Sequence, residues 1–137
     1  MRSVKPYVRA NILKMIYYSY FHFVMTYALL FWGNSPHSIK IFRLQKMITR
    51  IMMGCRSRDS CRKLFFNLEI LPLPSQYILS LLLFMIRNKN QFIVNSEIRH
   101  INTRQNANLH QPSVNMTKHQ KGVYYLGVEV FNMLPSD

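Results

Sequence analysis

The stretch "SIKIFRLQKMITRIMMGCRSRDSCRKLF", residues 38–65, decides the fold, because the helical periodicity of its residues ends there at a glycine, a strong signal for the end of a helix. Ser35 is a good N-cap, Pro36 suits the first helical position, and Gly54 suits the position after the last. We therefore predict a helix from Pro36 to Met53. On a period of about 3.6 residues, its apolar residues share one arc and its cations another, so one side suits a core and the other water or a polyanion. The apolar arc comprises Ile41, Leu44, Ile48, Ile51 and Met52.

Helices are also predicted on both sides of this stretch. Residues 5–32 read as one long helix, and residues 75–88 as another that follows a proline-containing turn. Between the two, residues 61–67 are expected to form a short helix capped by Ser57 or Ser60.

The composition changes after residue 88, where Asn and Gln become frequent and helical periodicity is lost. We expect irregular chain here, with short strands near Phe92–Val94 and Val114–Met116. The apolar "VYYLGVEVFNMLP" fits a strand or a short helix, and periodicity does not decide between them. The prediction is a mainly α fold, with a helical domain over residues 1–90 and an irregular segment over residues 91–137 that ends in a short apolar element.

The charge balance indicates an anionic partner. The 137 residues include 18 Lys and Arg against 5 Asp and Glu, a formal net charge of +13 at pH 7. A chain with this imbalance repels itself unless something anionic, such as nucleic acid or an acidic membrane, lies against it. The carboxylates are widely spaced, so no pair close in sequence could hold the metal ions that polymerases and nucleases need. We expect no catalytic residues, metal site, cofactor or small-molecule substrate.

The cysteines, Cys55 and Cys61, lie within the basic stretch but do not resemble a zinc site. Five residues separate them, there is no second cysteine pair, and the nearest histidine is His37. Zinc hairpins ordinarily separate paired ligands by about two to four residues. We therefore expect two free thiols near a helix junction.

The cations recur at one-turn spacing and then continue past the loop. Helix faces ordinarily mix Glu with Lys, because such pairs stabilise the helix, but no acid lies between Gly33 and Arg58. The planar Arg side chain can donate two hydrogen bonds to one phosphate. We favour contact with a nucleic-acid backbone over a solvated face. The predicted nucleic-acid-binding residues are Lys40, Arg43, Lys46, Arg50, Arg56, Arg58, Arg62 and Lys63.

The charge-free run "MIYYSYFHFVMTYALLFW", Met15–Trp32, supports an alternative hypothesis. Its 18 residues reach the lower limit of a membrane span, and cations precede it. His22 and Thr26 near its middle argue against a span, and such a helix can equally be the centre of a helical domain. The alternative is a small single-span membrane protein whose basic stretch lies at an anionic leaflet. The location would be the membrane if this helix spans, and the nucleus or cytoplasm if the chain is soluble.

Most of the chain, from about residue 11 to residue 136, resembles one family. The segments, in order, are "LLFWGNSPHSIKIFRLQKMITRIM", "RKLFFNLEILPLPSQY", "NTRQNANLHQP" and "GVYYLGVEVFNMLPS". They resemble the part that follows the polymerase core in reverse transcriptases of insect non-LTR (LINE-type, jockey-like) retrotransposons. The resemblance implies a helical thumb-like domain that grips template and primer through their backbones, with phosphate-facing roles for Lys40, Arg43, Lys46 and Arg50.

The resemblance also implies that catalysis is absent. The family's palm, with its Asp-Asp motif for two metal ions, and its endonuclease have no counterpart here, so the chain is expected to be a fragment that cannot polymerise nucleotides. Glu129 stands where the family usually has Lys, and Phe131 where it commonly has Tyr. Such drift is typical of an unselected copy. A third hypothesis is therefore a non-functional pseudogene product that folds poorly, because surfaces meant for the palm are exposed.

Overall fold

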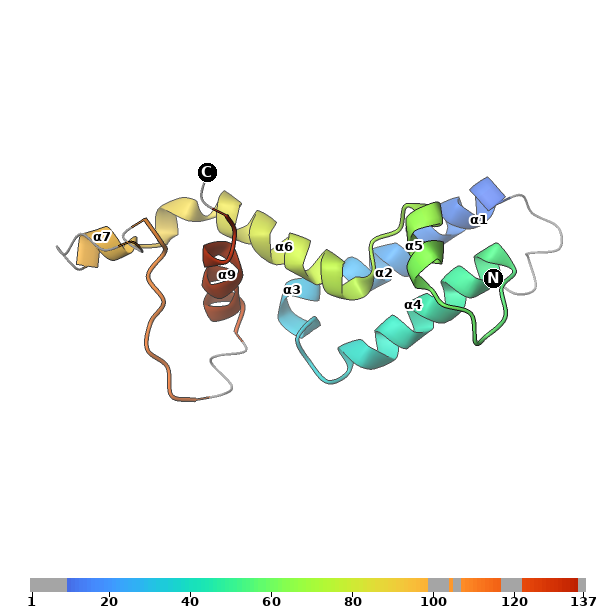
Figure 1. Cartoon of the computed structure of the whole chain (residues 1–137), viewed down its shortest axis with the longest axis horizontal. Coiled ribbons are helices and arrows are strands. Elements are labelled where there is room, and N and C mark those ends of the chain that lie inside the picture. Colours follow the sequence, from blue (N-terminus) through green and yellow to red (C-terminus); the bar gives the residue numbers. More distant parts are fainter. Residues whose placement is uncertain (1–9, 99–103, 105–106, 117–121, 136–137) are drawn as a thin grey trace. The chain divides into compact units, whose positions relative to one another are not determined.

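The computed structural model describes residues 10–98, 104, 107–116 and 122–135, and these are mainly helical (Figure 1). The described residues contain no sheet, and one isolated antiparallel bridge pairs Val94 with Leu109. The predicted mainly α class is confirmed. The chain divides into two compact units, Met1–Tyr77 and Ile78–Asp137. The functional division that the sequence suggested at residue 90 stays a prediction.

The first unit begins with a helical segment whose winding changes along its length. α1 (Ala10–Ile16) continues as a π-helix, η2 (Tyr17–His22), and then as α2 (Phe23–Thr26). A turn separates α2 from α3 (Leu29–Trp32), and within this turn Ala28 is left-handed with a φ of 51°.

The prediction of one helix over residues 5–32 is therefore wrong beyond residue 26, and residues 5–9 lie outside the described part of the chain. A left-handed non-glycine residue costs about 1–2 kcal/mol, so other contacts must hold the turn. Trp32 donates a hydrogen bond from Nε1 to the Tyr27 carbonyl at 2.8 Å. Met25 and Leu29, on either side of the turn, are both buried with Leu73 in one apolar cluster.

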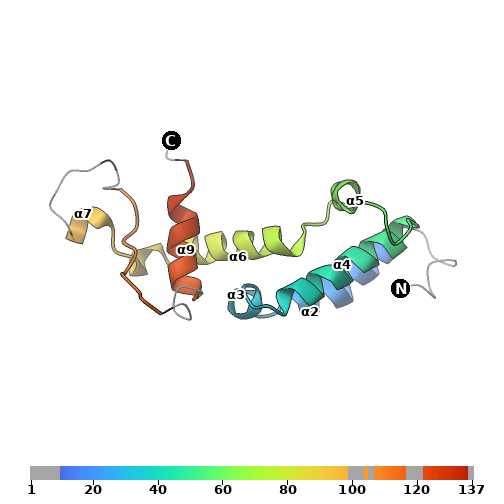
Figure 2. The ribbon, with the colours of Figure 1, turned by 60° about the horizontal axis from the view of Figure 1, so that its bottom comes forward.

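The helix at the centre of the basic stretch is α4 (Ser38–Met53), which runs beside α1 (Figure 2). It ends as predicted at Gly54, which is left-handed with a φ of 72°. The predicted start is wrong by two residues, because the chain turns from Gly33 to His37 before the helix begins. Ser35 caps nothing through its side chain there; its carbonyl accepts a hydrogen bond from the Ser38 hydroxyl at 2.7 Å.

The buried side of α4 includes two polar residues that were not among the residues predicted to face the core. Gln45 and Thr49 are fully buried, and Met52 is largely buried. Of the predicted arc, Ile41, Ile48 and Ile51 are half-buried and Leu44 is exposed. The core therefore faces a side of α4 rotated toward Gln45, because neighbouring elements supply hydrogen-bond partners for its amide.

α5 (Arg62–Leu68) and α6 (Leu73–Arg87) complete the helices that reach the first unit. Cys61 precedes α5 without a side-chain cap, so the prediction of Ser57 or Ser60 as the cap is wrong. α5 packs on α4 and adds its inward residues to the larger core. The buried members of that core are Leu13, Tyr17, Met52, Cys61, Leu64, Phe65, Leu68 and Ile70.

The second unit contains the rest of α6, η3 (Lys89–Gln91), α7 (Asn95–Ile98) and α9 (Val123–Asn132). The apolar C-terminal run is therefore a helix. Its small core is formed by Met85, Leu109 and Val128.

The extended chain near Leu109 is held by a side chain of α9. The Asn132 amide accepts a hydrogen bond from the Leu109 N–H at 3.0 Å and donates one to its carbonyl at 2.9 Å. Of the predicted strands, Phe92–Val94 contributes only the bridge at Val94, and residues 114–116 have no regular secondary structure. Asn132 thus takes the place of a neighbouring strand.

Candidate nucleic-acid interface

The outward side of α4 carries the first four predicted cations. Lys40 and Arg43 are exposed, and Lys46 and Arg50 are half-buried. All four lie away from the buried Gln45, at the one-turn spacing that keeps side chains on one side of a helix.

Two of these cations contact groups of the chain itself. The Lys46 ammonium lies 4.1 Å from the centre of the Phe42 ring. The Arg50 guanidinium donates from Nε to the Asp59 carbonyl at 3.0 Å. Neither the ring nor the carbonyl is an anion, so both contacts orient the side chains and leave their charges uncompensated.

The loop that follows α4 is shaped by its single acid. The Asp59 carboxylate accepts a hydrogen bond from the Arg56 backbone N–H at 2.8 Å, and the Asp59 N–H donates to the Arg56 carbonyl at 3.1 Å. This carboxylate is therefore engaged with backbone, and the side chains of Arg56 and Arg58 remain exposed.

α5 adds the last two predicted cations and an aromatic residue that sequence reasoning missed. Arg62, Lys63 and Phe66 are exposed on one side of the helix, while Leu64 and Phe65 on the other side are buried. The signal was present in the adjacent pair of phenylalanines. Neighbouring residues on a helix diverge by about 100°, so a short helix with one core-facing side buries only one of such a pair.

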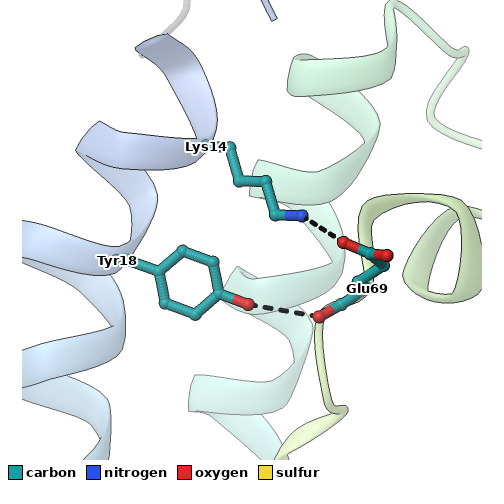
Figure 3. A network of polar contacts seen from close by, with 3 residues as sticks. All are labelled: Lys14, Tyr18 and Glu69. Carbon is teal, nitrogen blue, oxygen red and sulfur yellow. Dashed lines mark hydrogen bonds and ion pairs between the residues drawn. The ribbon is translucent and has the colours of Figure 1, made fainter. Parts of the chain in front are cut away.

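One ion pair occurs within the described residues, between Lys14 and Glu69, whose Nζ and Oε2 atoms lie 2.8 Å apart (Figure 3). Their hydrogen bond raises the pKa of Lys14 and lowers the pKa of Glu69. The Tyr18 hydroxyl also donates to the Glu69 carbonyl at 3.2 Å (Figure 3).

The eight predicted cations are hereafter called the basic surface. In the part of the chain that the structure describes, none of them forms an ion pair with a carboxylate. Asp59 and Glu69, the acids of the first unit, are engaged elsewhere. None of the eight cations therefore pairs directly with a carboxylate in the described part of the chain, and Asp59 is the one acid in the loop that carries Arg56 and Arg58.

Exposed apolar residues also occur in the first unit. On α4 itself, Ile39 and Met47 are exposed among the cations. The helical segment before α4 exposes a larger set, comprising Ile12, Met15, Tyr18, Tyr20, Phe23, Val24, Tyr27 and Phe31.

No single described helix is long and apolar enough to cross a membrane. α5 and α6 pass that test only as a pair, which is bent by 57°.

Cys55 is half-buried and Cys61 is buried, and both are free thiols, as predicted. Cys61 donates a weak hydrogen bond from Sγ to the Lys46 carbonyl at 3.7 Å. Among the described residues, no three His, Cys, Asp or Glu side chains converge in a way that could hold a metal ion.

Comparisons of this chain with protein-family models, curated proteins and solved structures found no match. The resemblance to retrotransposon reverse transcriptases therefore stays a prediction from the sequence.

Proposed function

We propose that this chain is a reverse-transcriptase-like, thumb-derived module that binds the phosphate backbone of RNA or DNA without sequence preference. The observation that carries the proposal is the basic surface, whose eight charges have no carboxylate partner among the described residues. A surface of this kind binds polyanions mainly by releasing their condensed counterions.

The dimensions of α4 suit such a partner. Lys40 and Arg50 are ten residues apart, which corresponds to about 15 Å along the helix. A DNA duplex carries one negative charge per ~1.7 Å of its axis, so this length faces several phosphates. Arg58, Arg62 and Lys63 are further exposed cations on the loop and the helix that follow α4.

The proposed role is binding without catalysis. Two-metal polymerases need convergent carboxylates. In the first unit Asp59 is engaged with the Arg56 backbone and Glu69 with Lys14, which leaves no such pair beside the basic surface.

The test is fluorescence anisotropy of the full chain on a primed RNA–DNA duplex over a range of salt concentrations. The variant is Lys40→Gln/Arg43→Gln, because both side chains are exposed and neither has a contact that α4 needs. The matched control is Arg87→Gln/Lys89→Gln, which removes the same charge from exposed positions in the second unit.

The plot of log affinity against log salt is expected to become shallower by about 0.9 for each phosphate contact that the variant removes. The control should keep the wild-type slope. Equal effects of the variant and the control would show that only the overall charge of the chain matters, and would overturn the assignment to the basic surface. The absence of salt-dependent binding would refute the proposal.

A second candidate is association with an anionic membrane, which the exposed Tyr20, Phe23 and Phe31 favour. Apolar side chains beside cations are typical of helices that lie in a membrane interface. Sedimentation with anionic vesicles tests this candidate. Apolar side chains buried in the interface should keep part of the protein with the lipid at salt concentrations that release it from nucleic acid.

A further inference from the structure

α5 exposes an aromatic side chain between two cations. Phe66 is 84% exposed, and it follows Arg62 and Lys63 by four and three residues on the same side of the helix. Residues at these spacings are neighbours on a helix surface. The opposite side of α5 is buried in the larger core, so the helix holds the Phe66 ring outward on a fixed support.

The surface beside Phe66 is hollowed. The Phe66 hollow has a volume of about 430 Å³. Its lining is mostly apolar, with Arg62 and Glu69 as the charged residues. The apolar lining residues are Phe65, Phe66, Ile70, Leu71 and Pro72.

The acidic edge of the hollow carries an ion pair at the protein surface. Glu69 ends α5 with a φ of 55°, and its carboxylate is paired with Lys14. The Tyr18 hydroxyl holds the carbonyl of the same residue (Figure 3). Because Lys14 offsets the Glu69 charge, Arg62 is the cation that remains uncompensated at this edge.

We propose that Phe66 and the Phe66 hollow bind an unpaired base of single-stranded RNA or DNA, while Arg62 and Lys63, on the same side of α5, hold its phosphates. This inference rests on the proposed function and specifies its substrate class. Every base has a flat face that stacks on an aromatic ring, so the contact needs no sequence preference. In a duplex the bases are stacked on one another, and the ring cannot reach their faces without opening a pair.

The charges around the ring favour this occupant over an apolar protein segment. An apolar protein segment would need only the hollow and would gain nothing from the cations beside it. Arg62 and Lys63 on both sides of an exposed ring are the combination that single-stranded nucleic-acid binders use, where cations follow the backbone and aromatic rings receive the bases.

The test compares two DNA strands with the same number of phosphates, one an oligothymidylate and the other made of base-free sugar-phosphate units. Fluorescence anisotropy of the full chain is expected to show roughly five- to a hundredfold tighter binding to the strand with bases. Phe66→Leu, which keeps an apolar side chain without a ring, should remove this preference, and Phe66→Trp should keep it. All three proteins should bind the base-free strand equally.

Phe31→Leu is the matched control, because Phe31 is also 84% exposed but does not line the hollow. It should keep the wild-type preference. Circular dichroism spectra that coincide for all the proteins will show that the substitutions leave the helices intact.

The outcomes separate this inference from the proposed function. Equal, salt-dependent binding of wild type to both strands overturns the base site and leaves phosphate binding standing. A preference that survives in Phe66→Leu, or one that Phe31→Leu also abolishes, overturns the assignment to Phe66. Failure to bind either strand overturns both proposals.

Discussion

Gln45 is expected to be the most sensitive polar residue of the first unit. Its side chain is fully buried in the core. The amide nitrogen Nε2 donates to the Tyr17 hydroxyl at 2.9 Å and to the Leu71 carbonyl at 3.0 Å, and Oε1 accepts from the Leu73 N–H at 2.8 Å. Leu73 begins α6, so its N–H is one of the donors that a helix start leaves without an internal partner.

The change Gln45→Leu keeps the size of the side chain and removes all three hydrogen bonds. The Tyr17 hydroxyl and the Leu73 N–H then remain buried without partners, at about 1–3 kcal/mol each. The apolar leucine recovers about 1–2 kcal/mol through its transfer from water. The central values of these terms lower the free energy of unfolding by about 2–3 kcal/mol. This is a large part of the ~5–15 kcal/mol of an ordinary domain.

Urea unfolding followed by Trp32 fluorescence measures this loss. Trp32 is the only tryptophan, and it packs against the buried cluster of Met25, Leu29 and Leu73, so it reports on the first unit. Asn67→Leu likewise replaces an amide side chain by leucine, at an exposed position of the same unit, and should change the free energy by less than about 0.5 kcal/mol.

A double-mutant cycle identifies the cause of the loss. Tyr17→Phe should destabilise the wild type and cost little in the Gln45→Leu protein, where the hydroxyl already lacks its partner. A Gln45→Leu protein as stable as the wild type would refute the reasoning.

Two other contacts make separate predictions. Asn132→Ala leaves the buried backbone N–H and carbonyl of Leu109 without partners, so the free energy of unfolding of the second unit should fall by about 1–3 kcal/mol. Hydrogen exchange of the Leu109 amide should then accelerate. Unchanged exchange would contradict the assigned contact. The hydrogen bond from Lys14 lowers the pKa of Glu69, so the pair stabilises the fold above the ordinary Glu pKa of 4.5 and ceases to do so as the pH falls through the lowered value. The difference in urea midpoint between the wild type and Glu69→Gln should therefore vanish in strong acid, and a difference that persists there would require another cause.

The sequence predicted features that local chemistry controls. Gly54 ends α4 because a left-handed residue is easiest as glycine, and the exposure of Lys40 and Arg43 follows from helical periodicity. The turn at Ala28 could not be predicted from the sequence, because alanine is the best helix former. Its conformation is imposed by side chains that meet only in the folded chain.

The buried side of α4 was misjudged for a related reason. A glutamine reads as a surface residue until the fold brings Tyr17 and Leu73 to its amide. In the candidate site, likewise, the positions of Lys46 and Arg50 depend on Phe42 and on the Asp59 carbonyl, and helical periodicity does not report such contacts.

The buried amide also changes the argument about charge on α4. The four cations of this helix form three like-charge pairs at spacings of three or four residues, and these cost about 1 kcal/mol in total. The hydrogen bonds of Gln45 contribute more than that, so α4 does not need a polyanion in order to fold. The absence of acids among these cations therefore has no explanation in the stability of the helix. The four positive charges remain available to an external partner. Added salt should act in opposite directions, raising the stability of the first unit slightly by screening the repulsion while it weakens nucleic-acid binding steeply.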